Sequence, residues 1–61
     1  MSIQERIREW MEAEGLTFLD VAKRVGCQPS TIHGWANGTE PKGLYLAKVE
    51  RLLRKWERAN A

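Results

Sequence analysis

Residues 17–38, TFLDVAKRVGCQPSTIHGWANG, have the pattern of two short helices joined by a tight turn. Gly26 stands at the turn, where a residue that adopts positive φ without steric cost lets one helix end and the chain reverse. Ala22 is small, which permits the close backbone approach of two helices that cross at a steep angle. The apolar positions of the two arms are Val21, Ala22, Val25, Ile32 and Trp35. We therefore predict two helices that share one apolar side.

The ends of both predicted helices carry sequence signals. Thr17 is the expected N-cap of the first helix, and Asp20 falls in its first turn, where the helix dipole favours an acid. The next helix is expected to begin after Gln28, with Pro29 at its first position, because a missing N–H is harmless there. It is expected to end just before Gly38, which is the predicted C-cap.

Amphipathic segments flank this pair of helices. The stretch Ser2–Glu5 has the form of a capping box, and the helix that follows is expected to end near Glu14, stopped by Gly15. A last helix is predicted from Leu44 to about Arg58. The apolar faces consist of Ile3, Ile7, Trp10 and Met11 in the first helix and Tyr45, Leu46, Val49, Leu52, Leu53 and Trp56 in the last. The pattern predicts an all-α, compact four-helix fold, with residues 1–61 forming a single domain.

The central stretch resembles the helix-turn-helix of the phage Cro/CI-repressor-type (XRE-like) family of DNA-binding proteins. Members of that family typically read LTxxxLAxxxGVSxSTISRWxxG. The corresponding residues here are Leu16, Thr17, Val21, Ala22, Gly26, Cys27, Pro29, Ser30, Thr31, Ile32, Trp35 and Gly38. The resemblance implies a sequence-specific regulator of transcription, a small phage- or plasmid-type repressor that reads the major groove of double-stranded DNA with the helix after Gln28.

Several departures from the family pattern bear on the predicted site. Gln28 replaces a serine, which is a better helix cap, and Phe18 replaces a glutamine that often follows the threonine. Gly34 stands where the family often has a large polar side chain, which removes one expected contact or lets the helix approach the DNA more closely. Cys27 takes a slot where valine is favoured, and we expect it to be a buried thiol that behaves as a small hydrophobe.

Charge is unevenly distributed along the chain. Residues 1–20 carry two Arg against four Glu and one Asp, a net charge of −3, whereas residues 21–61 carry eight Lys or Arg against three Glu, a net charge of +5. A basic half fits an anionic partner that approaches from one side. The basic stripe of the last helix lies opposite its apolar face and is expected to be solvated; it consists of Lys48, Arg51, Arg54, Lys55 and Arg58.

The composition also narrows the function classes. A single Cys excludes an internal disulfide, and one Cys with one His are too few ligands for a tetrahedral metal site. No nucleophile–base pair can be assembled, and the sequence lacks the apolar run of a signal peptide or membrane span. We therefore expect a cytoplasmic protein that is not an enzyme, uses no cofactor or metal, and has no membrane partner.

The predicted recognition helix offers short, neutral side chains rich in hydrogen-bond donors and acceptors, which suit the base edges of the major groove. Its N-terminal end is the part that usually reads bases. The candidates for base contacts are Gln28, Ser30, Thr31 and His33. Phosphate contacts are expected at helix N-termini and at the cation next to this helix. The candidates for phosphate contacts are Thr17, Asn37, Thr39 and Lys42.

A homodimer on a palindromic operator is expected, because a single recognition helix meets too few base pairs to select one site. The last helix is the available pairing surface, with Tyr45, Leu52 and Trp56 as candidate interface residues. Two other hypotheses stay open: an antitoxin- or adaptor-like protein-interaction module that does not bind DNA, and a membrane-surface binder acting through the last helix. Short polar residues on the recognition helix favour DNA binding over the protein-interaction module, since protein-interaction surfaces usually expose aromatic side chains.

Overall fold

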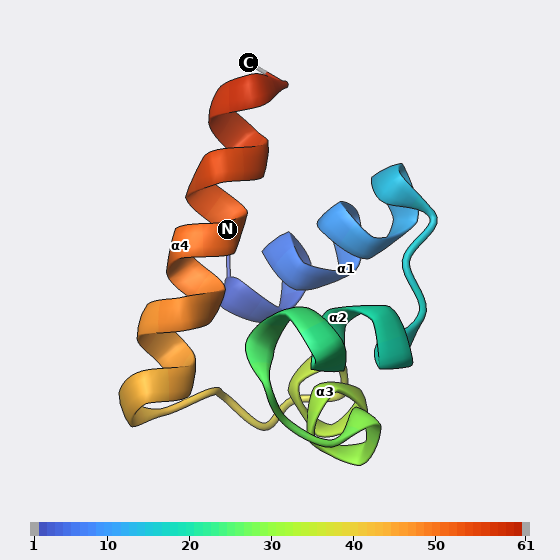
Figure 1. Cartoon of the computed structure of the whole chain (residues 1–61), viewed down its shortest axis with the longest axis vertical. Helices are drawn as coiled ribbons and strands as arrows, with labels where there is room; N and C mark the ends of the chain where they lie inside the picture. Colours follow the sequence, from blue (N-terminus) through green and yellow to red (C-terminus); the bar gives the residue numbers. More distant parts are fainter. Residues whose placement is uncertain (1, 61) are drawn as a thin grey trace.

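The computed structural model describes residues 2–60, which form four α-helices and no strand (Figure 1). The helices are α1 (Ile3–Glu14), α2 (Phe18–Val25), α3 (Pro29–Ala36) and α4 (Gly43–Ala59). The most extensive helix contact joins α2 to α3, while α1 packs on α3 and α4, and α4 also contacts α2. The predicted all-α fold with a central helix-turn-helix is confirmed.

The turn between α2 and α3 depends on Gly26. Its backbone is left-handed, with φ +87°, and its N–H donates to the carbonyl oxygen of Ala22 at 2.7 Å. The N–H of Cys27 donates to the same oxygen at 3.1 Å. A residue with a Cβ would be strained at this φ, so glycine lets the chain leave α2 abruptly and start α3 across it.

The C-terminal end of α3 differs from the prediction. Asn37, with φ −112°, is the C-cap, and Gly38 follows it with φ +122°. The N–H of Thr39 returns to the carbonyl oxygen of Gly34 at 2.9 Å. The glycine therefore reverses the chain one residue after the cap, and the helix ends at Ala36.

The helix caps were only partly predicted. At α1 the Ser2 hydroxyl oxygen accepts from the Glu5 N–H at 3.2 Å, but the carboxylate of Glu5 accepts from the Ser2 hydroxyl and not from its backbone, so the predicted capping box is incomplete. A full capping box occurs at α2. There the Thr17 N–H donates to Asp20 at 2.9 Å, and the Asp20 N–H donates to the Thr17 hydroxyl oxygen at 3.1 Å.

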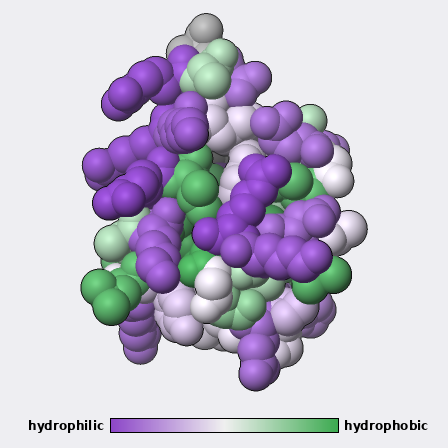
Figure 2. Space-filling model, viewed as in Figure 1, coloured by the Kyte–Doolittle hydropathy of each residue, from purple (hydrophilic) through white to green (hydrophobic). Residues whose placement is uncertain are grey.

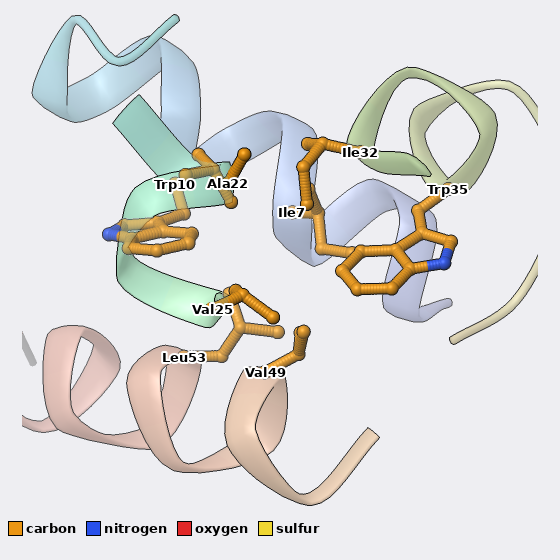
Figure 3. Packing of buried hydrophobic residues seen from close by; sticks show 9 residues of the cluster. Ile7, Trp10, Ala22, Val25, Ile32, Trp35, Val49 and Leu53 are labelled. Carbon is orange, nitrogen blue, oxygen red and sulfur yellow. The ribbon is translucent and has the colours of Figure 1, made fainter. Parts of the chain in front are cut away.

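The core lies where the four helices meet (Figure 3). Each helix contributes at least two apolar side chains, as the periodicity predicts. The buried cluster consists of Ile7, Trp10, Val21, Ala22, Val25, Ile32, Trp35, Val49 and Leu53. Trp35 is 4 % exposed beneath α3, so its predicted core position is confirmed.

The apolar face of α4 is narrower than predicted. Only Val49 and Leu53 are buried, while Leu52 and Trp56 are half-buried at the edge of the core. Tyr45 and Leu46 remain 40 % and 38 % exposed because they lie on the first turns of α4, where the core ends. Tyr45 contacts Trp35 with ring centroids 6.0 Å apart.

An ion-pair network fastens α1 to α4. Arg6 donates to both carboxylate oxygens of Glu57 at 2.8 Å each and to Glu50 at 3.0 Å. These bonds lower the pKa of Glu57 below its usual range. Both carboxylates of α4 therefore face α1, which fixes the rotation of α4 about its axis.

Candidate DNA interface

The first turn of α3 presents free polar side chains. Gln28 is the N-cap, with extended backbone (φ −86°, ψ 149°), and its side chain makes no capping hydrogen bond. Gln28 and Ser30 are exposed and Thr31 is half-buried, so three base-contact candidates stand together on one turn. Because the Gln28 side-chain amide makes no capping hydrogen bond within residues 2–60, it can bond to a ligand outside the protein.

His33 is held in place by residues from both ends of the helix-turn-helix. The ring of Phe18, at the start of α2, meets the His33 ring edge to face, with centroids 5.2 Å apart and an interplanar angle of 81°. The Asn37 side-chain amide donates to the His33 carbonyl oxygen at 2.7 Å and lies 3.4 Å from Nε2. Phe18, which replaces a glutamine of the family pattern, therefore has a structural role, since its ring supports the base-contact candidate His33. Asn37 is partly engaged in ending α3.

Thr17 lies at the N-terminus of α2, where the sequence predicts a phosphate contact. Hydrogen bonds from its backbone N–H and hydroxyl hold the pKa of Asp20 below its usual range. A carboxylate therefore already occupies this helix end. A phosphate approaching Thr17 also approaches that negative charge, which makes Thr17 the weakest of the four phosphate candidates.

The loop between α3 and α4 lies at the same end of the molecule as α3 (Figure 1), and it contains the exposed Thr39 and Lys42. The loop is anchored by Pro41, which is buried, and by Gln4, whose amide donates to the Gly38 carbonyl oxygen at 3.3 Å. Lys42 is the N-cap residue of α4 and makes no side-chain capping bond. The anchored loop thus carries a cation on the segment that leads directly from the end of α3 to the start of α4.

Gly34 lies half-buried against this loop. A Cβ built on it would meet the Thr39 side chain at 3.8 Å, which is an ordinary van der Waals distance. The fold therefore does not require glycine here. A long side chain from this position would meet Thr39 on its way out of the protein.

Arg8 is the residue of this region that the sequence analysis missed. Its guanidinium donates to the carbonyl oxygen of Ala36, the last residue of α3, from Nε at 2.7 Å and also from Nη2. A cation at a helix C-terminus also complements the helix dipole. Arg8 lies on the polar side of an amphipathic helix, so no signal in the sequence indicates that it contacts α3.

The remaining chemistry-bearing groups are few. Cys27 was predicted to be buried, but it is only half-buried against the core, because it lies in the exposed turn; partial burial raises the pKa of its thiol. Within residues 2–60, no three His, Cys, Asp or Glu residues are grouped so that they could hold a metal ion. No helix in that range has the length and apolar character needed to cross a bilayer.

Comparison with known proteins agrees with this geometry. The profile of the family described as helix-turn-helix matches residues 7–58, which include the whole of α2 and α3, α1 from Ile7 onward and α4 as far as Arg58. Searches of curated proteins and of solved structures returned no match. The family is one of DNA-binding regulators and not a catalytic one. On the match over residues 7–58, the chain belongs to the helix-turn-helix family of the Cro/CI-repressor type.

Proposed function

We propose that this chain is a sequence-specific regulator of transcription that binds double-stranded DNA, of the small phage- or plasmid-type repressor kind, and that it acts in the cytoplasm without catalytic activity. The observation that carries the proposal is the exposed first turn of α3. Its short neutral side chains are free of intramolecular capping bonds, and an α-helix fits the major groove, where each base pair has a distinct pattern of donors and acceptors.

The residues divide into two roles. We assign base contacts to the first turns of α3, where Gln28 can pair bidentately with adenine and the Thr31 methyl can meet a thymine methyl. The base-contact residues are Gln28, Ser30, Thr31 and His33. Lys42 is the principal phosphate contact, since it is exposed and cationic. Thr39, Asn37 and Thr17 are the further phosphate contacts.

We propose that two copies bind one palindromic operator. Among the predicted pairing residues, Tyr45 is the one on the end of α4 next to α3, and its neighbour Leu44 is 82 % exposed. Two recognition helices must meet the same side of one duplex, so pairing near this end suits DNA better than pairing at Trp56, toward the far end of α4 (Figure 1). Leu52 and Trp56 are secondary candidates.

A protein-interaction module without DNA binding is the alternative. If such a module bound its partner through α3, that helix would need exposed apolar anchors, but its large apolar residues, Ile32 and Trp35, are buried. The exposed large apolar side chains of the described chain lie on α2 and α4, at Leu19, Leu44, Tyr45 and Leu46. The free surface of α3 thus favours a polar ligand.

Gel shifts with several duplex pools over a salt series test the proposal. We expect retention that depends on sequence and falls by orders of magnitude between low and moderate salt, because phosphate contacts release counterions. Equal, salt-insensitive retention of all pools, or no retention at low salt, would contradict DNA reading by this chain.

A further inference from the structure

A row of cations lies on the outer face of α4, away from the proposed recognition surface. At 100° per residue, Arg51 lies about 160° around the helix from the buried Val49 and Leu53. The outer row consists of Arg51, Arg54, Lys55 and Arg58, all exposed. It spans about 10 Å along the helix axis. Hydrophilic side chains project along the α4 edge of the molecule, on the left in Figure 2.

The acidic residues of α4 do not neutralise this row. Glu50 and Glu57 are held by Arg6 of α1, and only Arg54 of the row pairs with an acid, at 3.4 Å from Glu50. The nearby Lys48 is directed to α2, where its ammonium lies 3.4 Å from the Val25 carbonyl oxygen. Within residues 2–60, three cations of the row therefore make no ion pair.

The row and α3 lie at different ends of the molecule. α4 rises away from α3, and its C-terminal half reaches the opposite end of the structure (Figure 1). The row occupies that half, in a structure with a longest extent of 29 Å. A straight duplex seated on α3 therefore does not reach Lys55 or Arg58, so these cations are not further phosphate contacts of the same DNA segment.

The side chains around the outer row indicate which kind of partner it can bind. The hollow between its long side chains is lined otherwise by Glu50 and by two alanines, Ala47 and Ala59. A membrane surface would need large apolar side chains that enter the lipid, and a protein interface would need aromatic or aliphatic anchors. Leu44, the large apolar residue on this face, lies about 10 Å before Arg51. Leu52 and Trp56, beside Lys55, are half-buried at the edge of the core, so the outward side of the row offers regularly spaced cations with alanines between them. Such a surface fits a polyanion, for example the phosphate backbone of nucleic acid.

We propose that the outer row of α4 is a second binding site for the phosphate backbone of duplex DNA, independent of sequence, so that one protein molecule can hold two DNA segments. The proposal rests on the proposed function only for the segment held by α3. The outer row itself needs no operator and acts on any duplex.

Amide chemical shifts of the 61-residue chain, titrated with a short duplex of arbitrary sequence at low salt, test this site. We expect two separate groups of shift changes, one in α3 and one over residues 51–58. In Gln28→Ala/Lys42→Ala the α4 changes should persist while the α3 changes shrink. In Arg51→Gln/Arg58→Gln the α3 changes should persist while the α4 changes shrink. The salt slope of binding at α4 should fall by about two units.

A control is Lys23→Gln, which removes an exposed cation from α2 and should leave the α4 changes in place. Shift changes in α3 without any over residues 51–58 would overturn the second site, as would loss of the α4 changes in Gln28→Ala/Lys42→Ala. Shift changes over residues 51–58 with vesicles containing anionic lipid but not with DNA would also overturn it. Loss of α3 changes alone would count against the proposed function and not against the outer row.

Discussion

Gln28 precedes α3 and Lys42 precedes α4, and the two residues are expected to contribute to binding in different ways. Gln28→Ala should cost about 1–3 kcal/mol and relax the preference at one base pair, because a base contact carries sequence information. Lys42→Ala should weaken binding to all sequences alike and reduce the salt slope by about one unit. Binding measurements on a panel of single-base operator variants, at several salt concentrations, separate the two effects. If Lys42→Ala changes the preferred sequence and Gln28→Ala leaves it intact, the two roles are assigned the wrong way round.

Trp35 supports the recognition helix from below and is 4 % exposed. Removing a buried Trp side chain typically costs about 3–5 kcal/mol, which is comparable with the whole stability of so small a protein. Trp35→Ala should therefore abolish DNA binding by unfolding the chain. Trp35→Phe should retain part of the stability and part of the DNA binding. Thermal melting followed by circular dichroism checks this. Unchanged melting of Trp35→Ala with lost binding would instead make Trp35 a contact residue.

At the scale of the helices, Arg8 of α1 closes the C-terminal end of α3. Arg8→Ala leaves the Ala36 carbonyl oxygen without this donor, and we expect a loss of about 0.5–1.5 kcal/mol in the free energy of unfolding. Arg58→Ala is the matched control, because Arg58 is exposed and has no ion-pair partner within residues 2–60. Urea unfolding of both variants checks the prediction. Equal midpoints would mean that Arg8 does not hold α3 in solution.

The capping box of α2 makes stability depend on pH. Hydrogen bonds from Thr17 lower the pKa of Asp20 in the folded state. A group with a lowered folded-state pKa stabilises the fold above its unfolded pKa, and that contribution is lost as the pH falls through the folded value. The melting temperature should therefore fall more steeply below pH 4 in the wild type than in Asp20→Asn, where this titration is absent. Parallel acid profiles of the two proteins would contradict the assignment.

The helices show which features a sequence can predict. The stop at Gly26, the start at Pro29 and the burial of Trp35 follow from local backbone preferences and periodicity, and all were predicted correctly. The contact between Phe18 and His33 was not, because it depends on how α2 and α3 cross. The Arg8 bond to α3 was missed for the same reason, since a surface arginine gives no sign of which carbonyl it meets.

The burial of the α4 face was also overestimated. Periodicity places Tyr45 and Leu46 on the apolar arc, but α4 extends past the core at its first turns and leaves them exposed. The DNA-contact residues stay predictions from the family pattern and from their free surface. A base contact depends on the operator, which the fold of the protein alone does not specify.

For the whole molecule, we expect weak pairing in free solution that strengthens when both copies hold DNA. Leu44→Lys should reduce cooperative binding to a palindromic duplex and leave the fold intact, because Leu44 is 82 % exposed. Leu19→Lys on α2 is the control, since Leu19 is also exposed but lies on another helix. Sedimentation with and without the duplex measures the stoichiometry. Saturation of a full operator by one copy, or unchanged cooperativity in Leu44→Lys, would refute pairing at this end of α4.

We propose that the first turns of α3 read the sequence of duplex DNA. A selection from random duplexes, with sequencing of the bound DNA, tests it most directly. We predict enrichment of a palindromic consensus with half-site centres about 34–36 Å apart. This is the spacing at which two-fold helix-turn-helix regulators of this family bind their half-sites. Selection with Gln28→Ala should lose the preference at one symmetry-related position in each half-site. Recovery of unenriched sequence from the wild type, or an identical consensus from Gln28→Ala, would contradict base reading by α3.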